Sequence, residues 1–212
     1  MLVTDRRRLG AAWEDALLER MRLAVDTGVQ FVQVREPGLE ASGLYRLVCR
    51  CMEVLHGSAT HLVVNDRADI AVAAGAHGVH LPGTGPPAAR LRSLLRPGAI
   101  LGRSVHDAGA AVTAAADGAD YLLFGTVFST ASKPGRPAAG TAALERVVRS
   151  TPLPVLAVGG VTADRAAEVA ATGAAGFAGI GLFMDGSFAD ARRNVRQAIA
   201  AFDTLPEFSP RA

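Results

Sequence analysis

The chain has 212 residues, of which 50% are hydrophobic and 5% aromatic, so it can bury one sizeable core and is expected to form a single domain. Lys and Arg number 22 against 20 Asp and Glu, and the net charge of +2 is not concentrated beyond the short run at residues 5–8. This balance predicts neither a nucleic-acid nor a membrane partner. The sequence carries no apolar run of 18 residues and no signal-peptide pattern, so we expect a cytoplasmic protein.

Short apolar segments bounded by turn residues alternate with segments of helical composition along the chain. The apolar segments are residues 1–5, 29–36, 61–66, 78–83, 100–104, 121–126, 154–160 and 176–181. Such alternation is typical of a parallel sheet covered by helices, and eight units predict a closed (β/α)8 barrel, an α/β TIM barrel, over residues 1–203. A doubly wound open sheet, usually of six strands or fewer, is the alternative. Residues 204–212 contain two prolines and no periodicity and are expected to be a tail.

Local signals refine the helical segments. Thr162 is expected to cap the helix before residue 173, where Gly173 ends it. Only a short helix fits residues 67–75. Cys49 and Cys51 stand two apart in a helical segment and point to different sides, so we expect packing residues and neither a disulfide nor a zinc site.

Polar side chains gather where the predicted strands end, although the strands themselves are apolar. In a (β/α)8 barrel these carboxyl ends form the active-site face. The polar residues there are Thr4, Asp5, Gln33, Arg35, Asn65, Asp66, His80, Ser104, His106, Thr126, Thr130 and Lys133. A barrel core alone does not need this set, so the pattern predicts a functional site.

Glycines follow the last two predicted strands, with Gly159 and Gly160 after the seventh and Gly179 and Gly181 after the eighth. Glycine leaves backbone N–H groups accessible, and the helix start that follows favours an anion. The loops after strands seven and eight of a barrel often bind phosphate. We therefore predict a phosphate site around Gly160 and Gly181, with simple tight turns as the alternative.

Two basic residues, Arg35 and Lys133, are placed to meet a carboxylate or a phosphate oxygen at the barrel mouth. For Arg35 the alternative is an ion pair at the rim with Glu36 or Asp66. Lys133 lies in a loop rich in Ser, Gly and Pro, where it either closes over a ligand or is solvent-exposed.

Two of the five histidines, His80 and His106, fall on the active-site face. Imidazole titrates near neutrality, which suits proton transfer, but a strand-end histidine is often structural. No zinc ligand set, Ser-His-Asp spacing or G-x-S-x-G motif occurs in the sequence.

Five stretches in chain order span nearly the whole sequence: "VQVRE", "VVNDRADIAVAAGAHGVHL", "LGRSVHD", "GADYLLFGTVFSTASKPG" and "PVLAVGGVTADRAAEVAATGAAGFAGIG". Together they resemble the thiamin phosphate synthase/TenI superfamily. That resemblance implies a (β/α)8 barrel that binds a small-molecule thiazole phosphate, and barrels of this family often pair, so a homodimer is compatible with the sequence. It implies substrate contacts for Gln33, Arg35, Asn65, Ser104, Thr130, Lys133, Gly160 and Gly181.

The superfamily has two activities. Its synthases join a pyrimidine pyrophosphate to thiazole phosphate, using a lysine on the pyrophosphate and two magnesium aspartates. Here Asp66 matches the first aspartate, but Pro37 and Gly85 stand where the lysine and the second aspartate are expected. The "GRSVH" stretch is similar to the TenI branch, the thiazole tautomerases. We therefore expect a tautomerase that aromatises a carboxythiazole phosphate, with His106 as its acid and base and no metal or other cofactor.

Two alternatives stay open from the sequence. One is a thiamin phosphate synthase that uses magnesium. The other is a non-catalytic regulator that binds thiazole phosphate.

Overall fold

The computed structural model describes residues 1–130, 135 and 137–202, and these fold into one parallel sheet in which every strand pairs with its neighbours in sequence. The strands are β1 (Leu2–Val3), β2 (Phe31–Val34), β3 (His61–Asn65), β4 (Gly78–Leu81), β5 (Ile100–Val105), β6 (Tyr121–Gly125), β7 (Val155–Val158) and β8 (Gly176–Ala178). A parallel bridge between Leu2 and Gly179 joins the first strand to the last, with Val3 N donating to Gly179 O at 2.9 Å. The sheet is therefore closed, and the predicted barrel is confirmed over the open sheet.

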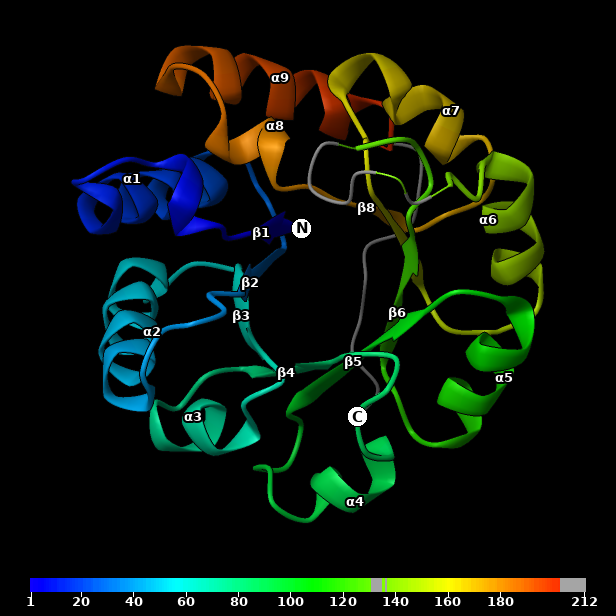
Figure 1. Ribbon diagram of the computed structural model, residues 1–212, viewed down its shortest axis with the longest axis horizontal. Helices are drawn as coiled ribbons and strands as arrows, with labels where there is room; N and C mark the ends of the chain where they lie inside the picture. Colours follow the sequence, from blue (N-terminus) through cyan, green and yellow to red (C-terminus); the bar gives the residue numbers. More distant parts are fainter. Residues whose placement is uncertain (131–134, 136, 203–212) are drawn as a thin grey trace.

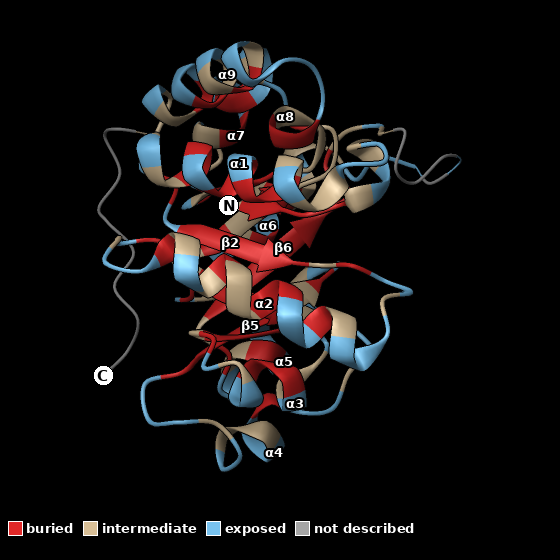
Figure 2. Cartoon of the chain, turned by 90° about the vertical axis from the view of Figure 1, so that its left-hand side faces the viewer, coloured by how far each residue is buried: buried red, intermediate tan, exposed pale blue. Residues whose placement is uncertain are grey.

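Helices ring the barrel and cover its outer surface (Figure 1). They are η1 (Arg6–Arg8), α1 (Trp13–Asp26), α2 (Ala41–Leu55), α3 (Ala68–Ala73), α4 (Ala88–Arg92), α5 (Ala108–Ala116), α6 (Thr141–Arg149), η2 (Ala163–Arg165), α7 (Ala166–Ala170), α8 (Gly181–Met184) and α9 (Phe188–Ala200). Figure 2 shows that the strands are mostly buried, while the longer helices are buried on one side and exposed on the other. This two-sided burial is what an apolar stripe on a helix predicts.

The local helix predictions are largely confirmed. The segment after β3 forms only the short α3, and Gly173 has a left-handed φ of +80° at the end of the α7 region. Thr162 stands at the N-cap position, but its side chain makes no capping hydrogen bond and the segment begins as the 3-10 turn η2. Cys51 is buried in α2 and Cys49 is partly exposed, and neither forms a disulfide.

The barrel interior is filled by residues that alternate along the strands. One core cluster lies inside the barrel and consists of Val3, Phe31, Val63, Ile100, Tyr121, Leu123 and Ala178, separate from the larger cluster between sheet and helices. Side chains two apart in a strand share a face. On β2 the inward face thus passes from Phe31 to Gln33 and on to Arg35, so apolar packing gives way to polar groups toward the carboxyl end.

The expected domain boundary at residue 203 and the tail at residues 204–212 lie outside the described residues. Within the described part of the chain, none of the helices has the length and apolar character needed to span a bilayer.

Candidate active site

A layer of polar side chains lies inside the barrel above the apolar cluster and joins β2, β3, β4 and β5. Gln33 Nε2 donates to Asn65 Oδ1 at 2.8 Å, and Asn65 is the register partner of His80 on the next strand. His80 Nε2 lies 2.8 Å from Ser104 Oγ. We call Gln33, Asn65, His80 and Ser104 the polar layer. Four residues that were singled out separately in the sequence are therefore linked into one site by strand register.

His80 is the buried centre of the polar layer, with 1% of its surface exposed. Both ring nitrogens have partners, because Nδ1 lies 3.0 Å from Tyr121 Oη. Burial, helped by the positive charges of Arg103 and Arg35, lowers the pKa of His80 to about 3. The imidazole is therefore neutral near pH 7 and presents one N–H donor and one acceptor.

Arg35 follows β2 at the barrel mouth, and its backbone N–H donates to Thr4 Oγ1 at 2.9 Å. Glu36 is buried and accepts from the backbone N–H of Arg6 at 3.1 Å. Burial raises the pKa of the Glu36 carboxyl. Among the described residues the Arg35 guanidinium has neither Glu36 nor Asp66 as an ion-pair partner, so the predicted alternative of a rim ion pair is not observed.

His106 directly follows β5 and is exposed at the barrel mouth. Its Nδ1 lies 2.7 Å from the carbonyl oxygen of Gly125 at the end of β6. Since a carbonyl oxygen only accepts, Nδ1 carries the proton and Nε2 is the nitrogen that faces ligand or solvent. The next residue, Asp107, caps α5 by accepting from Ala110 N at 2.8 Å.

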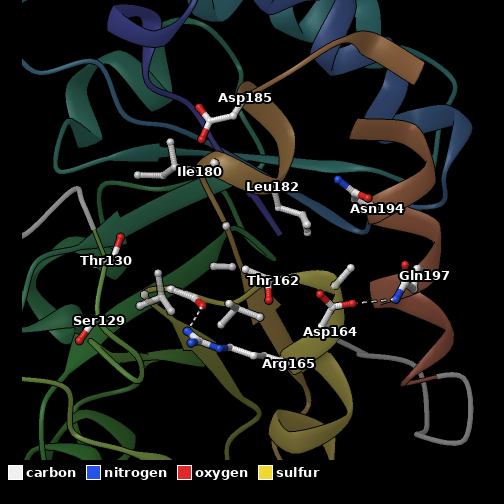
Figure 3. Close-up of a pocket in the computed structure, with 18 of the residues that line it drawn as sticks. Ser129, Thr130, Thr162, Asp164, Arg165, Ile180, Leu182, Asp185, Asn194 and Gln197 are labelled. Atoms are coloured by element: carbon white, nitrogen blue, oxygen red, sulfur yellow. Dashed lines mark hydrogen bonds between the residues drawn. The ribbon is translucent and has the colours of Figure 1, made fainter. Parts of the chain in front are cut away.

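A pocket of about 730 Å³ lies between the loops after β7 and β8, where the sequence predicted phosphate (Figure 3). Gly159 and Gly160 have φ angles of +102° and +63°. A Cβ on Gly160 would lie 2.5 Å from the carbonyl oxygen of Ser129, so this close approach requires glycine. Within the described residues, the backbone N–H groups of Gly160 and Gly181 donate to no protein acceptor. Both glycines line the pocket, so their N–H groups are candidate donors to a bound anion.

Charged side chains that the sequence analysis did not select line the same pocket. Arg8 donates to both oxygens of Asp185, at 2.6 and 2.8 Å. Arg165 donates to Gly160 O at 3.1 Å (Figure 3). The Arg165 guanidinium also lies 4.7 Å from the Phe128 ring centre. Arg8 belongs to the short basic run at residues 5–8. The signal that could have found it is the position of this run directly after the first predicted strand.

The loop after β4 is held by another missed residue, Arg103. Its guanidinium donates to the carbonyl oxygens of Pro86 at 2.6 Å, Gly85 at 2.8 Å and Gly83 at 3.1 Å. Of the two remaining predicted contacts, Thr130 lines the pocket between the loops after β7 and β8, and Lys133 lies outside the described residues.

Asp66 is exposed directly after β3, in a left-handed conformation with φ +61°, and its N–H donates to His80 O at 2.9 Å. In the described part of the chain, no group of three or more His, Cys, Asp or Glu side chains is arranged to hold a metal ion. Mg²⁺, however, usually binds one or two carboxylates together with substrate phosphates and waters. Asp66 therefore fits a magnesium ion that is shared with a phosphorylated substrate, and not one held by protein alone.

The closed (β/α)8 barrel carries its polar layer and its glycine-lined pocket at the carboxyl ends of the strands, which is where (β/α)8-barrel enzymes have their active sites. The family profile described as "Thiamine monophosphate synthase" (TMP-TENI) matches residues 1–183. The chain therefore belongs to this family, and the resemblance seen in the sequence is confirmed.

Similar proteins cover most of the chain. It is 39% identical to "Thiamine-phosphate synthase" of Methanoculleus marisnigri over 85% of this chain and 86% of the relative. It is 41% identical to "Putative thiamine-phosphate synthase" of Geobacter sulfurreducens over 84% and 82%. The solved "Thiamine phosphate pyrophosphorylase from Pyrococcus furiosus" superposes with a TM-score of 0.82 at 30% identity, covering 95% of this chain and 94% of the other.

These relatives correct the expected activity: the tautomerase interpretation, with its isomerase class, is wrong, and the findings favour the synthase alternative. The tautomerase was inferred from the "GRSVH" stretch and from Pro37 and Gly85, which replace the expected lysine and aspartate. Pro37 and Gly85 lie in rim loops, and loops vary more between relatives than the strands they connect. The loop around Gly85 also contacts a positively charged side chain, because the Arg103 guanidinium donates to three carbonyl oxygens of this loop.

Proposed function

We propose that the chain is a thiamine-phosphate synthase, which joins a pyrimidine pyrophosphate to thiazole phosphate and releases pyrophosphate. The observation that carries the proposal is the presence of two chemically different sites at one barrel mouth. One is the partly buried, uncharged polar layer at β2 to β5, and the other is the glycine-lined pocket at β7 and β8. A reaction between two substrates needs such a pair of sites, and the names of the relatives agree with it.

The thiazole phosphate is assigned to the glycine-lined pocket. Its phosphate would accept from the N–H groups of Gly160 and Gly181, and Thr130 stands at the pocket wall. Backbone N–H groups in a glycine-rich turn are well suited to phosphate, because no side chain separates them from the anion. Arg8 is close by, but its guanidinium is already paired with Asp185 and mainly neutralises that carboxylate.

The pyrimidine ring is assigned to the polar layer. Gln33 and Asn65 are amides, Ser104 is a hydroxyl and His80 is neutral, so none of these side chains carries a charge near pH 7. Amides and hydroxyls supply the donors and acceptors that an uncharged nitrogen heterocycle needs, whereas a buried phosphate would require cations. The pyrophosphate would then project to the rim, where the Arg35 guanidinium is a suitable partner.

A magnesium ion belongs to this proposal. Asp66 is the residue that would hold it, and the ion would neutralise charge that develops on the departing pyrophosphate. The chain itself binds and orients the two substrates: the polar layer fixes the pyrimidine, and the glycine-lined pocket fixes the thiazole phosphate. Bringing the reacting atoms together is itself a large part of the rate enhancement of a bimolecular reaction.

The test is the formation of thiamine phosphate by the purified protein from both substrates with Mg²⁺, followed by chromatography. Asn65→Leu, which removes the amide that accepts from Gln33, is expected to reduce kcat/KM by at least about 100-fold. Gln30→Leu serves as the control and should keep wild-type activity, because Gln30 is exposed just before β2, at the end of the barrel opposite the proposed site. Binding of both substrates without product would overturn the proposal.

A further inference from the structure

Tyr121 is a buried tyrosine inside the barrel that none of the site assignments uses. It opens β6 and is 1% exposed, and its hydroxyl oxygen lies 3.0 Å from Nδ1 of His80. The other ring nitrogen of His80 lies 2.8 Å from Ser104 Oγ. A continuous line of hydrogen bonds therefore runs from Tyr121 through His80 to Ser104, which is half-buried at the edge of the polar layer.

A glycine on β5, Gly102, leaves the space through which the Tyr121 side chain extends to His80 on β4. Tyr121 pairs in register with Gly102 on β5, and Gly102 pairs with His80 on β4. A Cβ on Gly102 would lie 2.1 Å from Tyr121 Cζ and 2.3 Å from its hydroxyl oxygen. The tyrosine ring thus crosses β5 over a glycine, where any side chain would collide with it. The ring also packs against Phe31, with a centroid separation of 5.5 Å.

The chemistry of the three groups sets the direction of the hydrogen bonds. His80 is neutral, so one ring nitrogen donates and the other accepts. Burial raises the pKa of Tyr121, so its hydroxyl keeps its proton. A phenol is a stronger acid than an aliphatic hydroxyl and therefore the better donor to an imidazole nitrogen. The favoured arrangement has the phenol donating to Nδ1 and the imidazole donating from Nε2 to the serine oxygen.

We propose that Tyr121 is a positioning residue: its hydroxyl fixes the Nε2–H tautomer of His80 and thereby directs the Ser104 hydroxyl hydrogen toward the bound pyrimidine. The identity of that ring rests on the proposed synthase function. In the opposite tautomer the serine would donate to His80 and could offer the substrate only an acceptor. Tyr121 thus determines which hydrogen-bonding group the site presents to the substrate, although it does not touch the substrate itself.

The tautomer is measured first, in the ligand-free protein and without reference to activity. Long-range proton–nitrogen NMR of the histidine rings, assigned for His80 by its loss in His80→Gln, is expected to show the Nε2–H tautomer in the wild type. Tyr121→Phe keeps the ring that packs on Phe31 and is expected to give a mixture of the two tautomers. An Nδ1–H tautomer in the wild type, or an unchanged tautomer in Tyr121→Phe, would overturn the proposal.

Kinetics then separate positioning from a general effect on folding. Tyr121→Phe is expected to lower kcat for thiamine phosphate formation by about 10-fold, with the KM for thiazole phosphate unchanged. In a Ser104→Ala background the same change should have no further effect, because Tyr121 acts through Ser104. An equal loss in both backgrounds would show a merely structural role.

The matched control is Tyr45→Phe, since Tyr45 is the other tyrosine of the chain and is 40% exposed on α2. It should keep wild-type kcat and tautomer. If no variant and no wild-type protein forms thiamine phosphate, the synthase assignment fails, while the tautomer measurement still decides the role of Tyr121 toward His80.

Discussion

The side chains of Gln33 and Asn65 are joined across β2 and β3 inside the barrel, with Gln33 Nε2 donating to Asn65 Oδ1 at 2.8 Å. This bond leaves the Gln33 carbonyl and the Asn65 NH2 group to face a ligand. Gln33→Glu is expected to raise the KM for the pyrimidine pyrophosphate by about 10-fold or more, because a carboxylate cannot donate to Asn65 and adds charge in a buried site. Steady-state kinetics with each substrate varied in turn checks this, and a change confined to the KM for thiazole phosphate would contradict it.

Gly160→Ala tests the glycine-lined pocket. The new Cβ would collide with the Ser129 carbonyl and crowd the proposed phosphate, so the KM for thiazole phosphate should rise by about 10-fold or more. Gly57→Ala is a matched control, since Gly57 has a similar φ of +74° but open space around a Cβ. It should cost about 1 kcal/mol of stability and leave both KM values unchanged. An equal kinetic effect of the two substitutions would exclude a local role of Gly160.

The pair of Arg8 and Asp185 leads to a prediction about charge at the pocket. Arg8→Gln leaves the Asp185 carboxylate unneutralised near the proposed phosphate, so the KM for thiazole phosphate should rise by about threefold to 10-fold. Asp185→Asn should not raise this KM, and adding it to Arg8→Gln should restore a value close to that of the wild type. If Asp185→Asn fails to correct the single variant, Arg8 acts on the substrate directly.

The buried His80 leads to a prediction about pH and stability. Its folded-state pKa of about 3 lies below the ordinary value near 6.5, so the folded protein binds this proton less readily than the unfolded chain. The contribution of neutral His80 to the free energy of unfolding is therefore complete above pH 6.5 and is lost as pH falls toward 3. The loss amounts to at most about 5 kcal/mol for a shift of this size. Urea unfolding of the wild type and of His80→Gln between pH 7 and pH 4 checks this. The wild type should lose more unfolding free energy over this range, and parallel pH profiles would contradict the prediction.

His106, the expected acid and base of a tautomerase, has no proton-transfer role in the proposed synthase. It is exposed and anchored to the Gly125 carbonyl at 2.7 Å. His106→Asn is expected to keep kcat for thiamine phosphate formation within about 10-fold of the wild type, since only contacts at the rim are altered. A loss of 1000-fold or more in kcat would restore His106 as a catalytic residue. Circular dichroism of the variant serves as the folding control.

The sequence predicted the barrel and selected most residues of the candidate site, because both depend on patterns that are local in the chain. Short apolar strands that alternate with helices predicted the fold. Polar residues at strand ends indicated Gln33, Asn65 and Ser104, and the glycines after the seventh strand indicated Gly160. The link between His80 and Tyr121 could not be predicted in the same way. It depends on the register of β4, β5 and β6, which brings His80, Gly102 and Tyr121 side by side. It also requires glycine at position 102, because any side chain there would collide with the Tyr121 ring.

The tautomerase prediction failed for a different reason. It rested on the likeness of the "GRSVH" stretch to the TenI branch and on Pro37 and Gly85, which stand where a synthase lysine and aspartate are expected. Pro37 and Gly85 belong to rim loops, and loop residues change without altering the strands that carry a site. Arg8 and Arg103 were missed because their partners, Asp185 and the carbonyl groups of residues 83–86, are distant in sequence or belong to the backbone.

The central claim is that one barrel mouth binds two substrates and joins them. The most direct measurement is pyrophosphate release in the presence of Mg²⁺, with the pyrimidine pyrophosphate supplied alone and then together with thiazole phosphate. The account predicts release only when both are present, with one pyrophosphate for each thiamine phosphate formed. Pyrophosphate release at the same rate without thiazole phosphate, or no release in either case, would contradict it.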